Sequence, residues 1–173
     1  ADEIVTKELA NEILEKVKDK NYDHFYIPIL NYIYTFKVKY GWMACLAPDG
    51  KFCLYRKGYK IWKEGLVHPS YKIKGKKGET LKTSIQHYMS KNISELLARF
   101  NRNSSLYALE LKKKKLNMKK LLSVRKIFSR FIKCYFSRMG FKSGYLGLLI
   151  SILSAIYPFV SAIKSKEDET TGH

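Results

Sequence analysis

The first twenty residues carry hydrophobic and polar positions with the period of an amphipathic helix. Thr6 precedes the run as a capping residue, and Glu8 in the first turn would complement the helix dipole. The hydrophobic side of this run consists of Leu9, Ile13, Leu14 and Val17. We therefore predict a short helix from Thr6 to about Lys20.

The next seventy residues have the pattern of strands and turns. Tyr22 to Val38 is rich in Tyr, Phe and Ile, which favours extended structure, although Asn31 to Lys39 is also compatible with a short helix. Between Trp42 and Tyr88, glycine and proline turn signals separate short runs such as Lys51 to Tyr55 and Tyr71 to Ile73. This segment predicts three or four short strands.

Two helical patterns follow. The sequence Asn-Ile-Ser-Glu at 92–95 has the form of a capping box, which predicts a helix running from there towards Lys115. The run from Asn117 to Met139 predicts one further helix, stopped by Gly140. Its hydrophobic residues share one side: Leu121, Val124, Phe128, Ile132 and Phe136. Its bases lie largely off that stripe: Lys119, Lys120, Arg125, Lys126, Arg130 and Lys133.

Gly144 to Ile163 contains no charged residue and is about as long as a helix needs to cross a hydrocarbon core of roughly 30 Å. Small residues recur along one stripe, which would let a second helix approach closely: Gly144, Gly147, Ser151, Ser154, Pro158 and Ser161. We expect a membrane contact, with the helix either lying in the interface or crossing the bilayer. The alternative is a helix buried in a soluble core, because Pro158 and the serines weaken the transmembrane signal.

The distribution of charge along the chain indicates a binding partner. The chain has 33 Lys and Arg against 15 Asp and Glu, a formal charge of +18, and Lys112 to Lys142 contains many bases and no acid. Since these bases adjoin the apolar segment, anionic lipid explains them better than nucleic acid, and we expect no nucleic-acid partner. The three cysteines have neither the spacing nor the number of a disulfide framework or a zinc site.

A series of short motifs follows the same chain order as one enzyme family. The motifs are Ala1-Asp2-Glu3 before the first helix, Gly41-Trp42, Leu54-Tyr55-Arg56-Lys57, Leu66-Val67-His68, the segment Gly75 to Leu81, Gln86-His87-Tyr88, and Leu97 to Ser105. In order and spacing they resemble the membrane-associated inverting glycosyltransferases of family 2, and within it the bacterial lipopolysaccharide core glycosyltransferases.

The resemblance covers nearly the whole chain and implies the C-terminal part of a GT-A nucleotide-sugar transferase. The expected fold class is α/β, in the form of an α+β fragment. The resemblance divides the chain into part of the catalytic domain (1–91), basic amphipathic helices (92–142), an apolar membrane-associated helix (143–164) and a polar tail (165–173). On this interpretation the nucleotide-binding half and the first Asp of the metal motif precede the chain, which by itself has little or no transferase activity.

The resemblance also suggests metal and catalytic residues. Asp2 would contact Mg²⁺ or Mn²⁺ on the donor diphosphate, Glu3 would orient it, and His68 would be a further metal or phosphate contact. The ordinary alternatives are dipole compensation for an acid before a helix and a structural role for a lone histidine. Relatives carry an acid directly after Leu-Val-His, whereas this chain has Pro69, so the general base is unassigned and His68 and Glu64 are the remaining candidates.

Three further residues are candidates for substrate binding. Arg56 could bind a phosphate through its forked guanidinium, or could form a salt bridge at the sheet edge. Trp42 could form part of the acceptor wall, or could pack in the core. His87 is expected at a strand end near the site.

The function that the resemblance implies is transfer of a sugar from a nucleotide-sugar donor to a membrane glycolipid or envelope glycan, such as lipopolysaccharide core. Its expected place is the cytoplasmic face of the bacterial inner membrane, as a peripheral or single-span protein held by anionic lipid. The alternative is a noncatalytic membrane-binding scaffold protein. The sequence contains no P-loop, dinucleotide fingerprint, HExxH or GxSxG motif, so those chemistries have no support.

Overall fold

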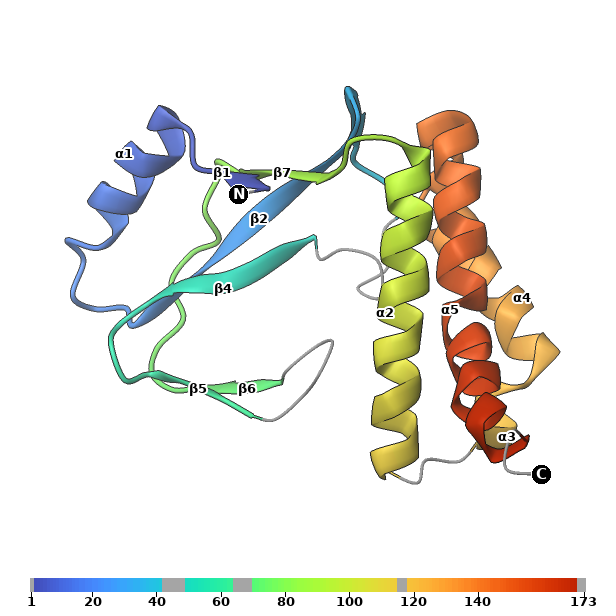
Figure 1. Ribbon diagram of the computed structural model, residues 1–173. Helices are drawn as coiled ribbons and strands as arrows, with labels where there is room; N and C mark the ends of the chain where they lie inside the picture. Colours follow the sequence, from blue (N-terminus) through green and yellow to red (C-terminus); the bar gives the residue numbers. More distant parts are fainter. Residues whose placement is uncertain (1, 42–48, 64–69, 115–117, 171–173) are drawn as a thin grey trace.

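The computed structural model describes residues 2–41, 49–63, 70–114 and 118–170, and it combines a mixed sheet with a group of helices (Figure 1). The strands are β1 (Glu3–Ile4), β2 (His24–Ile33), β3 (Phe36–Val38), β4 (Gly50–Tyr55), β5 (Lys60–Trp62), β6 (Tyr71–Ile73) and β7 (Ile85–Ser90). The helices are α1 (Lys7–Lys16), α2 (Ile93–Lys114), α3 (Met118–Leu121), α4 (Val124–Ile132) and α5 (Gly144–Thr170), with a π-helical turn η1 (Lys133–Ser137) and a 3₁₀ turn η2 (Gly140–Ser143).

The main sheet is organised around β2. Its strand order is β1-β7-β2-β3, and β4 also pairs with β2. The β2–β7 pair is parallel, while the β1–β7, β2–β3 and β2–β4 pairs are antiparallel, so the protein is a mixed α/β structure. Strands β5 and β6 form a separate antiparallel pair. The predicted strands are confirmed, and the alternative of a short helix over Asn31 to Lys39 is wrong, because Tyr34 turns the chain with a φ of 53° and β3 pairs back onto β2.

One face of β2 supplies both hydrophobic clusters of the core. Near its beginning, Phe25, Ile27 and Ile29 pack with Leu9 of α1 and with residues at and before β7. At its end, Ile33 packs with β7, α2 and α5. These residues are spaced by two or four positions along the strand, so their side chains point to the same face of the sheet. The core is therefore split between α1 at one end of β2 and the helical group at the other (Figure 1).

Helix α1 follows the predicted pattern and is clamped to the sheet by one acid. The Thr6 side chain accepts from the backbone N–H of Leu9, which confirms the predicted cap. The helix ends at Lys16 rather than near Lys20. The Glu12 carboxylate accepts backbone hydrogen bonds from Lys82 (2.7 Å) and Thr83 (2.8 Å), which join α1 to the segment that leads into β7.

The first helix after the sheet begins where the sequence predicts, but the second predicted helix is divided into shorter segments. Helix α2 begins after Asn92, whose side-chain oxygen accepts from the backbone N–H of Glu95 at 2.8 Å. The single helix predicted over Asn117 to Met139 is wrong. Ser123 has extended backbone angles and separates α3 from α4, and η1 follows α4 directly.

Helix α5 packs closely against its neighbours through the predicted stripe of small residues. Ser151, Ser154 and Ser161 are fully buried, and a Cβ added to Gly147 would lie 1.8 Å from the carbonyl oxygen of Gly140. The helical segment from Gly140 to Glu167 is long and apolar enough to cross a membrane, while 56% of its most apolar window is buried within the protein. Its length and composition are compatible with membrane association, although much of its surface packs inside the protein.

The clamp at Glu12 predicts a stability change. Glu12→Ala removes the acceptor of two backbone N–H groups and should lower the free energy of unfolding by about 1–2 kcal/mol at pH 7. Burial raises the pKa of Glu12, but these hydrogen bonds and the charge of Lys16 lower it by more, so the pKa lies below 4.5. The difference from wild type should therefore shrink as the pH falls below that value. Denaturant unfolding measures both effects. The exposed Glu15→Ala on the same helix is the control, and an equal loss there would contradict the clamp.

Candidate functional site

A row of polar side chains crosses the main sheet between the two hydrophobic clusters. Glu3 of β1 pairs in register with His87 of β7, and His87 pairs with Asn31 of β2. Asn31 and His87 are buried, with exposed fractions of 1% and 7%. Asn31 occupies one of the inward positions of β2, which are otherwise Phe25 and isoleucines. The row therefore lies on the covered face of the sheet, where buried polar groups need partners.

The imidazole of His87 is held from both sides. Its Nδ1 is 2.7 Å from Oδ1 of Asn31, and its Nε2 is 3.4 Å from Oδ2 of Asp2. Since an amide oxygen only accepts, Nδ1 donates to Asn31, and Nε2 donates to Asp2 when the ring is protonated. Burial lowers the pKa of His87 below its ordinary 6.5, and Arg99 lowers it further, while Asp2 and Glu3 act in the opposite direction.

Asp2 is the exposed end of this chain of contacts. Its Oδ2 also lies 3.5 Å from Nη2 of Arg99, which projects from α2. Partial burial raises the pKa of Asp2, but hydrogen bonds from its own backbone, from His87 and from Arg99 more than offset this, and the pKa lies below 3.8. Asp2 is therefore an ionised, solvent-accessible carboxylate placed between the imidazole of His87 and the guanidinium of Arg99.

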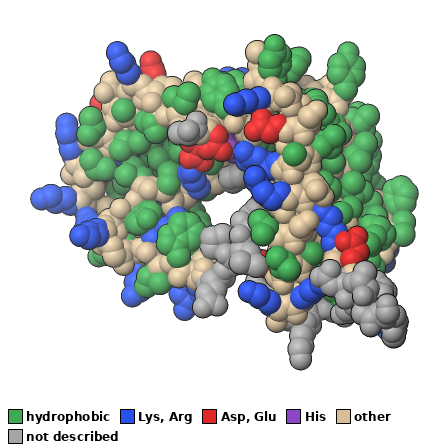
Figure 2. All heavy atoms as spheres, in the orientation of Figure 1, with side chains coloured by type: hydrophobic (Ala, Val, Ile, Leu, Met, Phe, Trp, Pro, Cys, Tyr) green, Lys and Arg blue, Asp and Glu red, His purple; other side chains and the backbone are tan. Residues whose placement is uncertain are grey.

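Glu3 is engaged separately. Its carboxylate forms an ion pair with Lys51 of β4, and both side chains are about one-third exposed. This contact joins strand β1 at the sheet edge to β4. Figure 2 shows acidic, basic and histidine side chains gathered between the sheet and α2. We call Asp2, Glu3, Asn31, Lys51, His87 and Arg99 the polar cluster.

The polar cluster can contribute to a metal site only in combination with a substrate. Within the described residues, no group of three His, Cys, Asp or Glu side chains could hold a metal ion. Mg²⁺, however, is commonly held by one or two carboxylates together with substrate phosphates and water. The exposed carboxylate of Asp2, which also pairs with His87 and Arg99, is a ligand of that kind, and Arg99 beside it is suited to bind phosphate oxygens.

The other predicted site residues do not all lie in this cluster. Trp42, Glu64 and His68 lie outside the described residues. Arg56 pairs with Asp23 at 3.4 Å, near the beginning of β2, so the salt-bridge alternative is the one observed. Asn31 lies about 25 Å further along that strand at 3.3 Å per residue. His87 lies within β7 rather than at a strand end, which corrects the predicted position.

Three members of the cluster, Asn31, Lys51 and Arg99, were not predicted as site residues. Asn31 had a detectable signal, because it interrupts the isoleucines at alternate positions of β2 with a polar side chain. Arg99 had none, since an arginine on an amphipathic helix usually faces solvent. Its contact with Asp2 depends on how α2 docks beside the sheet.

An apolar cleft opens beside the end of β2. Its volume is about 1110 Å³, and it lies between the β2–β3 turn and the beginnings of α2 and α5. Its apolar lining includes Ile33, Tyr34, Phe36, Ile93, Tyr145, Leu146 and Leu149. Ile33 is only two residues beyond Asn31, so the cleft and the polar cluster share the same strand.

Comparison with known proteins adds no relative. No protein-family model, curated protein or solved structure matches the chain. Assignment of a function therefore depends on the polar cluster, the apolar cleft and the sequence motifs.

The charges around His87 predict opposite pKa shifts in two variants. Arg99→Ala should raise the pKa of His87, because a nearby positive charge is lost, and Asp2→Asn should lower it, because a negative charge is lost. Titration of the His87 ring by NMR measures both. Shifts of the same sign in the two variants would contradict the geometry of the cluster.

The same burial predicts a pH-dependent stability. The His87 pKa is below 6.5 in the folded protein, so the unfolded chain takes up this proton first as the pH falls. The free energy of unfolding should therefore decrease between about pH 7 and the folded pKa. His87→Gln should remove that part of the slope, as measured by denaturant unfolding at several pH values.

Proposed function

We propose that the chain belongs to an inverting glycosyltransferase of family 2 with the GT-A fold, which transfers a sugar from a nucleotide-sugar donor to a membrane glycolipid or envelope glycan, such as lipopolysaccharide core. The observation that carries the proposal is the exposed, ionised Asp2 between His87 and Arg99. The position of Asp2 before α1 corresponds to the metal motif that the sequence resembles.

In this proposal the cluster handles the donor diphosphate. A bound Mg²⁺ or Mn²⁺ would neutralise charge that develops on the leaving diphosphate. Asp2 supplies the protein carboxylate, and Arg99 binds phosphate oxygens through its guanidinium. His87, fixed by Asn31, keeps the Asp2 carboxylate in position. The general base is left unassigned, with Glu64 and His68 as candidates outside the described residues.

The apolar cleft supports a lipid-linked acceptor. A glycolipid has a polar sugar to react and an apolar part to bind, and the chain places a polar cluster and an apolar cleft along the same strand. The α5 segment, which is long and apolar enough to cross a membrane, supports a place at the bacterial inner membrane. We place the protein at the cytoplasmic face of this membrane, where nucleotide sugars are available. We expect no nucleic-acid partner.

The second candidate is a noncatalytic membrane-binding scaffold. It is favoured by one observation, namely that Arg99 already occupies the carboxylate that a metal would use. The two candidates differ in donor binding. A scaffold should bind neither nucleoside diphosphate nor nucleotide sugar, even in the natural full-length protein.

A donor-binding and turnover experiment tests the proposed function. In the full-length protein with Mg²⁺, a panel of nucleotide sugars should yield turnover with one donor and a membrane glycolipid fraction. Asp2→Asn should reduce kcat by at least about 100-fold, since it removes charge stabilisation of the leaving group. Glu15→Gln on α1 is the matched control and should retain activity. Absence of donor binding by isothermal titration calorimetry across the panel would favour the scaffold.

A further inference from the structure

Helix α4 presents its hydrophobic stripe to the outside of the protein. The stripe that the sequence would place against a core consists of Val124, Phe128, Ile132 and, in η1, Phe136, and each of these side chains is more than half exposed. The side of the helix that packs inwards carries Ile127, Phe131 and Cys134 instead. Figure 2 shows hydrophobic side chains gathered along the side of the molecule where α4 and α5 lie. We call the four exposed residues the α4 stripe.

The opposite side of α4 is basic. Lys126 and Arg130 each follow a stripe residue by two positions, which places them about 200° around the helix from it. Among the described residues, no acidic side chain pairs with either base. An apolar face with a Lys/Arg-rich face behind it is the pattern of a helix that lies in the interface of an anionic membrane.

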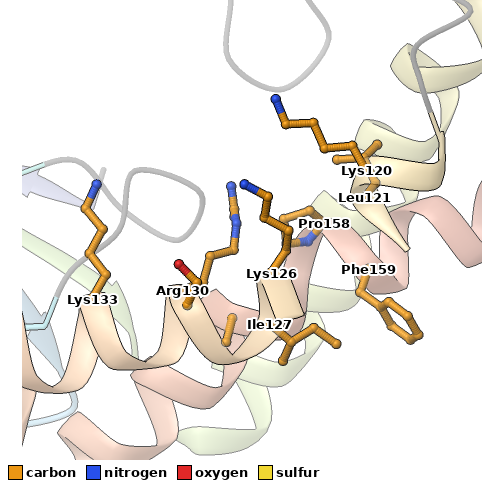
Figure 3. Close-up of a pocket in the computed structure, with 10 residues that line it drawn as sticks. Lys120, Leu121, Lys126, Ile127, Arg130, Lys133, Pro158 and Phe159 are labelled. Atoms are coloured by element: carbon orange, nitrogen blue, oxygen red, sulfur yellow. The ribbon is translucent and has the colours of Figure 1, made fainter. Parts of the chain in front are cut away.

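A cavity on the basic side gives this surface a place for one headgroup. It measures about 290 Å³, below the usual range for whole small-molecule ligands, and lies between α3, α4 and the Pro158 region of α5. Four bases line it: Lys120, Lys126, Arg130 and Lys133. In Figure 3, Lys126 and Arg130 project from α4 and Lys133 from the adjoining η1, all on the same side, and Lys120 extends from α3 above them. Most of the other lining is apolar and includes Ile127, Pro158 and Phe159, with Ser129 as a further polar residue.

We propose that α4 lies in the plane of an anionic bilayer, with the α4 stripe among the acyl chains and the basic cavity binding the phosphate of an anionic lipid headgroup. The mixed lining fits a phosphate attached to a lipid better than a free anion, because basic and apolar groups meet in one cavity. The inference specifies the membrane attachment within the proposed function and requires no transferase chemistry.

Binding to vesicles tests the surface. The chain should co-sediment with vesicles of phosphatidylcholine and phosphatidylglycerol more strongly than with phosphatidylcholine alone, and added salt should weaken this preference. Phe128→Ser should weaken binding by about tenfold or more, as expected for loss of one buried aromatic side chain. Ile61→Ser, at another exposed hydrophobic position, on β5, is the control. Binding by Phe128→Ser equal to that of the wild type would overturn the proposal.

Two double variants test the basic cavity separately from the α4 stripe. Lys126→Gln with Arg130→Gln should weaken binding to the anionic vesicles by about 30-fold, at roughly 1 kcal/mol per base. Lys72→Gln with Lys74→Gln removes the same charge from an exposed strand segment and should have a much smaller effect. Equal losses in the two double variants would overturn the headgroup cavity. Full suppression of vesicle binding by millimolar inorganic phosphate at constant ionic strength would identify a free-anion site and also overturn it.

A third measurement separates insertion from self-association. A tryptophan introduced by Phe128→Trp should be quenched by brominated acyl chains beyond the quenching of the parent protein. If the α4 stripe instead covers a second copy of the chain, analytical ultracentrifugation will show a dimer that Phe128→Ser dissociates, with no extra quenching, and the proposal fails. None of these assays uses donor or acceptor. Loss of membrane binding therefore leaves the transferase proposal standing, and absent turnover with intact membrane binding defeats only the transferase proposal.

Discussion

The parallel pairing of β2 with β7 is the constraint on which the rest of the structure depends. Strands β3 and β4 also pair with β2, and β1 joins the sheet by pairing with β7. The register of the pair sets His87 opposite Asn31 and carries Glu3 into the same row. A slip of one residue would send the isoleucines of β2 and the polar row to the opposite face, so the core and the candidate site require the same alignment.

The polar row sits where the two halves of the core meet. Packing with α1 covers one end of β2, and packing with α2 and α5 covers the other, so the Asn31 position lies between them. Buried polar groups there are tolerated because they satisfy one another: Asn31 holds His87, and His87 reaches the exposed Asp2. These contacts connect the interior of the sheet to Asp2, whose side chain is about half exposed.

The helical group combines two different uses of hydrophobic residues. In α5 the small residues face inwards and permit close contact, as at Gly147 against Gly140, while larger side chains such as Ile150 and Leu153 enter the core. In α4 the larger hydrophobic residues face outwards and the bases lie behind them. One helix therefore stabilises the fold, and the neighbouring helix presents hydrophobic side chains at the surface of the protein.

Local elements were predictable from the sequence because their signals act over a few residues. The Thr6 cap, the Asn92 cap and the turn-separated strands are confirmed, since capping hydrogen bonds and strand alternation need no distant partner. The sequence motifs predicted Asp2 and His87 as site residues. The contacts that these residues make with each other, with Asn31 and with Arg99 depend on the strand register and on the docking of α2. The direction of the α4 stripe was also a tertiary outcome, because an amphipathic helix has the same periodicity whether its apolar side meets a core or a lipid surface.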